Sequence, residues 1–183
     1  MRFGPDILAR CDVLAAISED RDRLTRTYLT PQHRAAGERI AGWMRDAGMD
    51  ARFDALGNVV GRYAAADPDA PLVVTGSHMD TVVDAGRYDG IFGVLGPIAC
   101  VADLHARGRR LPYTLEVVAF GDEEGVRFGV SMLGSRALAG RFDIAVLDRR
   151  DANGVSLREA LVAFGGDPGA IAALARRGLA AYV

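Results

Sequence analysis

Five residues in two short segments of this sequence have side chains that could carry out chemistry: His78, Asp80, Asp89, Glu123 and Glu124. The first three follow the apolar run 71–76, and the two glutamates follow the apolar run 114–120. Clustered carboxylates repel one another, and their burial is costly unless a cation compensates the charge. Imidazole together with carboxylate suits zinc or manganese. The pattern therefore predicts a divalent-metal site.

The order of these residues also suggests separate tasks. Asp80 lies two residues beyond His78, where its carboxylate could accept the second ring N–H and so fix the tautomer that binds a metal. Glu123 and Glu124 are adjacent in a predicted loop, so their side chains can point in different directions. One of the two could bind metal while the other transfers protons.

Four other ionisable residues receive a structural interpretation. Asp84 and Asp122 are expected to be exposed or structural rather than catalytic. His33 is predicted on the polar face of a helix. His105 is predicted near a helix C-terminus, where a cation suits the helix dipole.

The apolar runs before the two acidic segments predict neighbouring strands. Runs 71–76 and 114–120 are short and continuously apolar, which is typical of strands buried on both faces. Residues 91–107 between them are predicted to form a helix, and this alternation indicates an α/β fold with a mainly parallel sheet. Because ligands of such sheets bind beyond the carboxyl ends of the strands, the two acidic segments should converge at one edge.

The rest of the chain is predicted to add helices and further strands. A helix over 5–16 should turn four apolar side chains inward, namely Ile7, Leu8, Val13 and Leu14. Thr30-Pro31 is typical of a helix start, and Gly48 of a helix end. The other predicted elements are two strands within 51–63 joined by a turn at Gly57-Asn58, helices at 132–139, after the Ser156–Glu159 capping box and at 167–177, and a strand beginning at 179.

Composition narrows the class of protein. The 183 residues suffice for one domain, and a net charge of −2 without a basic stripe argues against a nucleic-acid partner. No apolar run reaches the ~18–20 residues that a membrane span needs, and the N-terminus has no signal-peptide pattern. Cys11 and Cys100 are far apart, and Cys100 lies in an apolar helical run, where we expect it to be buried. A disulfide framework is not expected, which favours a reducing, cytoplasmic location.

The acidic segments together resemble the hydantoinase/carbamoylase family of di-metal zinc-aminopeptidase-like hydrolases. The stretches that carry the resemblance are GSHMDTVVDAGRYDG (76–90), EVVAFGDEEGVRF (116–128) and GSR (134–136). The resemblance extends from about Leu24 through DALGNVVGR (54–62) to the last residue. It implies an α/β fold with three αβα layers around a mixed, mainly parallel sheet.

The resemblance also implies a role for each residue. His78 would bind one metal ion, Asp89 would bridge two, and Glu124 would bind the second. Asp80 would orient His78, and Glu123 would be the general base and acid. The implied cofactors are two divalent ions, Zn²⁺ or Mn²⁺.

The implied reaction is hydrolysis of a ureido C–N bond in a small substrate. Allantoate, a compound of purine catabolism, is the preferred substrate. N-carbamoyl-L-amino acids and N-carbamoyl-β-alanine, the substrate of β-ureidopropionases, are the alternatives. The residues that bind substrate are not identified by the sequence.

Members of this family are much longer than 183 residues, so the resemblance implies that residues 1–183 are the N-terminal part of a catalytic metallohydrolase domain. Histidines that complete both metal sites would lie elsewhere, as would a second domain that forms a homodimer and contacts substrate. We therefore expect the isolated chain to be inactive. The alternative from another class is a non-catalytic fragment, for which little tight metal binding is expected.

Overall fold

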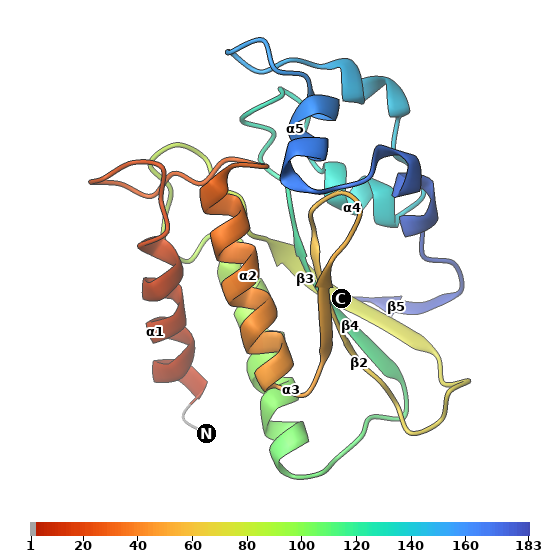
Figure 1. The fold of residues 1–183 in the computed structure, drawn as a ribbon. Helices are drawn as coiled ribbons and strands as arrows, with labels where there is room; N and C mark the ends of the chain where they lie inside the picture. The colour runs from red at the N-terminus through yellow and green to blue at the C-terminus, as the bar shows by residue number, and fades with distance from the viewer. Residues whose placement is uncertain (1–2) are drawn as a thin grey trace.

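The computed structural model describes residues 3–183, which form one five-stranded sheet flanked by helices (Figure 1). The strands are β1 (Asp50–Phe53), β2 (Val59–Tyr63), β3 (Leu72–His78), β4 (Thr114–Phe120) and β5 (Leu179–Tyr182). The sheet order is β1-β2-β4-β3-β5, with β3 parallel to β4 and β5, and β2 antiparallel to β1 and β4. The predicted mixed α/β sheet is confirmed, and β3 and β4 are neighbours as predicted.

The helices begin and end largely where the sequence predicts. They are α1 (Phe3–Ala15), α2 (Pro31–Asp46), α3 (Ile91–Ala106), α4 (Leu133–Leu138) and α5 (Leu157–Phe164), with the 3₁₀ helices η1 (Ile144–Asp148) and η2 (Pro168–Leu174). Thr30 caps α2 by accepting the backbone N–H of His33, and Ser156 and Glu159 form the predicted capping box of α5. The helix predicted over 167–177 is wrong in type and length, because only the short η2 forms there.

Helices α1, α2 and α3 lie together on one face of the sheet and bury the main apolar cluster (Figure 1). From α1, Ile7, Cys11 and Leu14 enter this cluster at the spacing of one helix stripe. Leu8 and Val13 were also predicted inward, but they are 45% and 44% exposed. That prediction is wrong because α1 packs mainly on α3, so only one narrow stripe of α1 is covered.

Cys100 is exposed, which contradicts its predicted burial. Helix α3 turns Val94, Leu95 and Ile98 toward the core, and Cys100 lies on the outward stripe with the half-exposed Phe92. Because α3 is apolar along its whole length, its sequence does not show which side of the helix packs on the sheet. Cys11 and Cys100 are both free thiols, in agreement with the absence of a predicted disulfide framework.

The opposite face of the sheet carries a smaller apolar cluster, formed by Val60, Val74, Val118, Phe120 and Leu138 of α4. Beside it the buried Glu116 accepts Arg176 Nε at 2.8 Å and pairs with Arg62 at 3.3 Å. A buried carboxylate between two guanidinium groups has its charge compensated locally. Within residues 3–183, short α4 supplies the helical cover of this apolar cluster.

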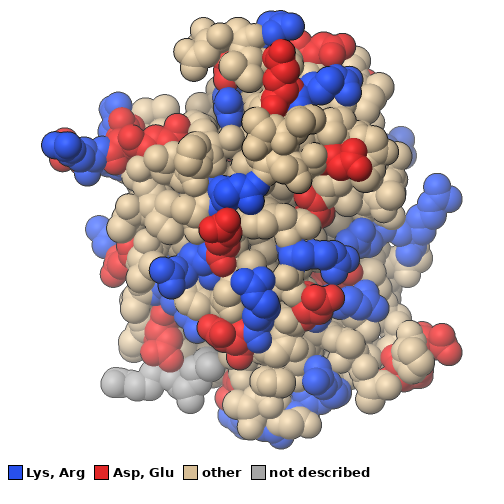
Figure 2. All heavy atoms as spheres, viewed as in Figure 1, with Lys and Arg blue, Asp and Glu red and all other residues tan. Residues whose placement is uncertain are grey.

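Charges on the surface are mixed in sign. Figure 2 shows arginine and acidic side chains interspersed over the visible face. Exposed ion pairs such as Arg107 with Asp103, at 2.8 Å, follow the same pattern and contribute little to stability. In the described residues, no helix combines the length and apolarity required to cross a membrane.

Candidate metal centre

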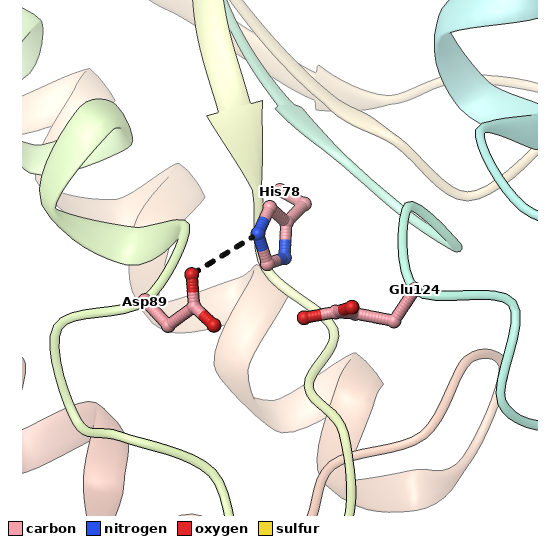
Figure 3. Close-up of side chains that lie close together, drawn as sticks. All are labelled: His78, Asp89 and Glu124. Carbon is pink, nitrogen blue, oxygen red and sulfur yellow. Dashed lines mark ion pairs between the residues drawn. The ribbon is translucent and has the colours of Figure 1, made fainter.

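Three of the predicted site residues converge beyond the carboxyl ends of β3 and β4. His78 is the last residue of β3, Asp89 lies just before α3, and Glu124 lies in the loop after β4 (Figure 3). One potential ligand atom from each side chain lies within 4.8 Å of the others, and His78 Nε2 is 3.7 Å from Asp89 Oδ1. An imidazole and two carboxylates at this spacing are a donor set suited to a divalent cation.

The parallel pairing of β3 and β4 explains the convergence. His78 pairs with Phe120, so both strands end at the same level of the sheet. Strand β3 extends two residues beyond the predicted run, which places the imidazole on the strand itself. The segment 121–132, here called the acidic loop, then brings Glu123 and Glu124 beside it.

The second ring nitrogen of His78 has a backbone acceptor. His78 Nδ1 lies 2.9 Å from the backbone carbonyl oxygen of Asp80 and 3.7 Å from the Asp80 carboxylate. A carbonyl oxygen can only accept, so Nδ1 carries the proton and Nε2 presents its lone pair. This is the predicted tautomer, with Nε2 available to bind a metal. The acceptor that fixes it is the backbone carbonyl of Asp80 and not the Asp80 carboxylate.

The Asp80 carboxylate instead holds the acidic loop. It is buried and accepts the backbone N–H groups of Glu123 at 3.0 Å and Glu124 at 3.2 Å. Burial raises the pKa of Asp80, and the two N–H donors oppose that rise. Asp80 thereby joins the segment after β3 to the segment after β4, while its role in orienting His78 stays a prediction.

A cavity of about 470 Å³ opens over the cluster, which is a volume suited to a small-molecule ligand. Glu123 Oε2 lies 4.0 Å from His78 Nε2 within this cavity. Burial raises the pKa of Glu124, His78 lowers it, and the charges of Glu123 and Asp89 raise it. A cation bound among these groups would relieve the repulsion that raises this pKa.

Arg26 lies behind the cluster, and sequence reasoning did not find it. Its side chain is buried, with Nε donating to the Met79 carbonyl at 2.8 Å and an Nη donating to the Leu14 carbonyl at 2.8 Å. Burial lowers the pKa of Arg26 to about 10, and the Asp80 charge opposes that shift. This buried guanidinium group and the carboxylate that holds the acidic loop therefore interact electrostatically. In the sequence this arginine has no feature that separates it from the surface arginines.

His33 and Asp122 are both fully buried, and the prediction that His33 lies on a polar helix face is wrong. The loop before α2 covers His33, whose ring packs edge-on against Tyr28 at 5.4 Å between centroids. Burial lowers the pKa of His33 to about 3 and raises that of Asp122 to about 8. Within the described residues, neither side chain has a hydrogen-bond partner. Asp84 is exposed, as expected.

Gly90 approaches the imidazole so closely that no side chain fits. It has φ 65°, a conformation that favours glycine, and a Cβ there would lie 2.5 Å from His78 Nε2. We expect Gly90→Ala to displace the imidazole and to weaken zinc binding by about 10–100-fold. Titration with zinc measures this effect.

The matched control is Gly86→Ala in the same segment, because a Cβ at Gly86 meets no atom of residues 3–183 within 4 Å. This variant should bind zinc like the wild type. Equal affinities for the Gly90 and Gly86 variants would show that the imidazole does not contribute to metal binding.

The fold and the cluster define an α/β domain with a candidate metal centre, and comparison with known proteins places it in a family. The family model for peptidase family M20/M25/M40 matches residues 74–172, and the chain belongs to this family. A crystal structure of a hydantoinase/carbamoylase family amidase from Burkholderia ambifaria superposes with a TM-score of 0.87 and 35% identity, over 98% of this chain and 44% of that chain. The predicted resemblance to the hydantoinase/carbamoylase family is thereby confirmed.

Two curated relatives show the same similarity in sequence. An N-carbamoyl-L-amino acid amidohydrolase from Geobacillus stearothermophilus is 42% identical over 154 residues, which cover 84% of this chain and 38% of the relative. An allantoate deiminase from Arabidopsis thaliana is 41% identical over 158 residues, which cover 85% of this chain and 30% of the relative. The chain therefore spans well under half the length of the relatives that it matches.

Proposed function

We propose that this chain carries the metal-binding part of an amidohydrolase that cleaves a ureido C–N bond in a small substrate. The observation that carries the proposal is the cluster of His78, Asp89 and Glu124 within 4.8 Å, at the base of an open cavity. The names of the two curated relatives, one acting on N-carbamoyl-L-amino acids and one on allantoate, support the type of bond.

We propose that two divalent ions, zinc or manganese, bind here with His78, Asp89 and Glu124 among their ligands, and the cluster of these three donors supports a cation site. Bound cations of this kind lower the pKa of a water molecule and polarise the carbonyl oxygen that it attacks. Three side chains offer too few ligands for two ions, because each zinc ion takes about four. We propose that water molecules and residues outside this chain supply the others, so that the chain alone binds metal without turnover.

Glu123 has the position of the proton carrier in this proposal. Its carboxylate lines the cavity next to His78, and its side chain is 37% exposed, so that substrate and water can reach it. As general base it removes a proton from the attacking water, and as general acid it returns a proton to the leaving nitrogen. Asp80 fixes the backbone N–H of Glu123 and thereby limits where this carboxylate can reach.

Allantoate is the proposed substrate, with N-carbamoyl-L-amino acids and N-carbamoyl-β-alanine as the alternatives. Ammonia release from each compound tests the choice, using zinc- or manganese-loaded protein extended to the length of its relatives, beside the 183-residue chain. We expect the extended protein to cleave allantoate fastest and the 183-residue chain to show no turnover. Cleavage of N-carbamoyl amino acids without cleavage of allantoate would overturn the substrate assignment.

The same assay tests whether the protein cleaves ureido C–N bonds at all. An extended protein that hydrolyses none of these ureido compounds, although it binds metal, would overturn the proposal of a ureido-cleaving enzyme. Turnover by the 183-residue chain itself would show that further ligands are not needed.

A further inference from the structure

Asn58 connects two parts of the molecule that are far apart in sequence. It is buried, with 1% of its surface exposed, at the turn between β1 and β2. Its Oδ1 accepts the backbone N–H of Gly121 at 2.9 Å, and its Nδ2 donates to the Asp54 carboxylate at 2.7 Å. Both ends of the side-chain amide are therefore used, one on the turn and one on the first residue of the acidic loop.

The turn that carries Asn58 is itself held firmly. The Asp54 carboxylate also accepts the backbone N–H groups of Leu56 at 2.9 Å and Asn58 at 3.0 Å. The backbone N–H of Asp54 donates to the Asn58 carbonyl at 2.9 Å. Because the side chain of Asp54 satisfies several donors at once, the amide of Asn58 has one well-defined place.

Helix α4 packs directly on the same amide. A Cβ at Gly134 would lie 2.2 Å from Asn58 Oδ1 and 3.0 Å from the Gly121 carbonyl oxygen, so only glycine fits there. The neighbouring Met132 and Ser135 line the cavity over the metal-ligand cluster. Asn58 is thus in contact with both the acidic loop and the helix that together form one wall of the cavity.

We propose that Asn58 is a positioning residue for the metal centre, which sets the start of the acidic loop and so the places of Glu123 and Glu124. The consequence of Asn58 for catalysis rests on the proposed function. The effect of Asn58 on the position of the loop does not depend on that function. The loop is held at two points: by Asn58 at Gly121, and by Asp80 at the glutamates. Loss of the hydrogen bond between Asn58 and Gly121 should make the loop more mobile while the sheet keeps its structure.

Three variants of the 183-residue chain test the proposal. Asn58→Leu removes both hydrogen bonds at similar volume. Asn58→Asp keeps an acceptor for Gly121 but sets a second carboxylate against Asp54. The exchanged pair Asp54→Asn with Asn58→Asp restores donor and acceptor across the contact and keeps the wild-type net charge. Val101→Ala, which truncates a buried side chain of α3 in the main apolar cluster, is a control that lowers stability away from the loop.

Amide hydrogen exchange of the metal-free chain gives the first measurement. In both single Asn58 variants, the N–H groups of Gly121, Glu123 and Glu124 should exchange faster by about tenfold or more relative to those of β4. The exchanged pair should return near wild-type rates. The Val101 variant should accelerate the amides of the loop and of β4 equally. The same equal acceleration in the Asn58 variants would mean that Asn58 contributes only to overall stability, and it would overturn the proposal.

Zinc titration of the same proteins gives the second measurement. The single variants should bind zinc about 10–100-fold more weakly, with recovery in the exchanged pair. A wild type that binds no zinc would count against the metal centre and leave the exchange result to decide the role of Asn58. If both single variants fail to fold, the exchanged pair decides, because its failure to restore native exchange would overturn the proposal.

Discussion

Replacement of Glu123 by glutamine is expected to lower turnover of the ureido substrate by about 10²–10⁴-fold, which is the usual contribution of a general base. The change removes the basic oxygen but keeps the shape of the side chain. The backbone N–H of residue 123 still donates to Asp80, so the acidic loop should keep its place. Because Glu123 lies outside the group of three ligands, zinc affinity should fall much less than turnover does.

Initial rates of ammonia release from the extended protein, beside zinc titrations, measure the two parts of this prediction. Glu38→Gln is the matched control, because Glu38 is an exposed residue of α2 and is distant in sequence from the metal-ligand cluster. A variant at Glu123 that turns over substrate at the wild-type rate would exclude it as the base. Loss of zinc binding together with turnover would instead make Glu123 a metal ligand.

Replacement of His33 by leucine is expected to make the protein resist acid better. The pKa of His33 is about 3 in the folded state, against 6.5 as its ordinary value, because burial and then the charges of Arg26, Arg34 and Arg127 disfavour the protonated ring. Between these two values the unfolded chain binds a proton that the folded chain does not, so stability falls as the pH falls. Between pH 7 and pH 4 this one group should cost about 3 kcal/mol.

The His33→Leu variant lacks this cost, so its free energy of unfolding should exceed that of the wild type by about 3 kcal/mol more at pH 4 than at pH 7. At pH 7 it should be at least as stable, because among residues 3–183 neither ring nitrogen has a hydrogen-bond partner to lose. Urea unfolding at both pH values measures this. Leu161→Ala, an apolar truncation in the cluster around Phe164, is the control and should lower stability equally at both. Parallel loss in the wild type and the His33 variant would contradict the prediction.

The elements that position the metal centre could be predicted because their signals are local. Continuous apolar runs mark β3 and β4, and the order strand, helix, strand makes them parallel neighbours, which places His78 and Glu124 at one edge. The cap at Thr30 and the capping box at Ser156 are local in the same way. The strand predicted over residues 71–76 ends too early, because small polar residues such as Ser77 give no apolar signal.

The errors arise where a distant segment decides burial. His33 looks polar on its helix, yet the loop carrying Tyr28 covers it. Cys100 looks buried because α3 is apolar all round, yet the sheet meets only one side. Asn58 reads as a turn residue, and its contact with Gly121 spans 63 positions, through the pairing of β2 with β4. No local pattern reports such a contact.

The contact between His78 and Asp80 shows a subtler limit. The spacing of two positions correctly predicts that His78 and Asp80 lie close together. It does not show whether the carboxylate or the backbone carbonyl of Asp80 is the acceptor. The backbone carbonyl of Asp80 lies at hydrogen-bond distance from His78 Nδ1, whereas the carboxylate lies farther away. The carboxylate is thereby left to bind the N–H groups of the acidic loop, a task that depends on the neighbouring strand.

Equilibrium titration of the 183-residue chain with zinc and with manganese tests the metal centre most directly. Glu124→Ala removes one of the three ligands, and Asp148→Asn removes an exposed carboxylate outside the cluster as the control. We expect the wild type and the control to bind metal, and the Glu124 variant to bind it about 10-fold or more weakly. Absence of binding by the wild type, or equal binding by all three proteins, would contradict a metal centre at His78, Asp89 and Glu124.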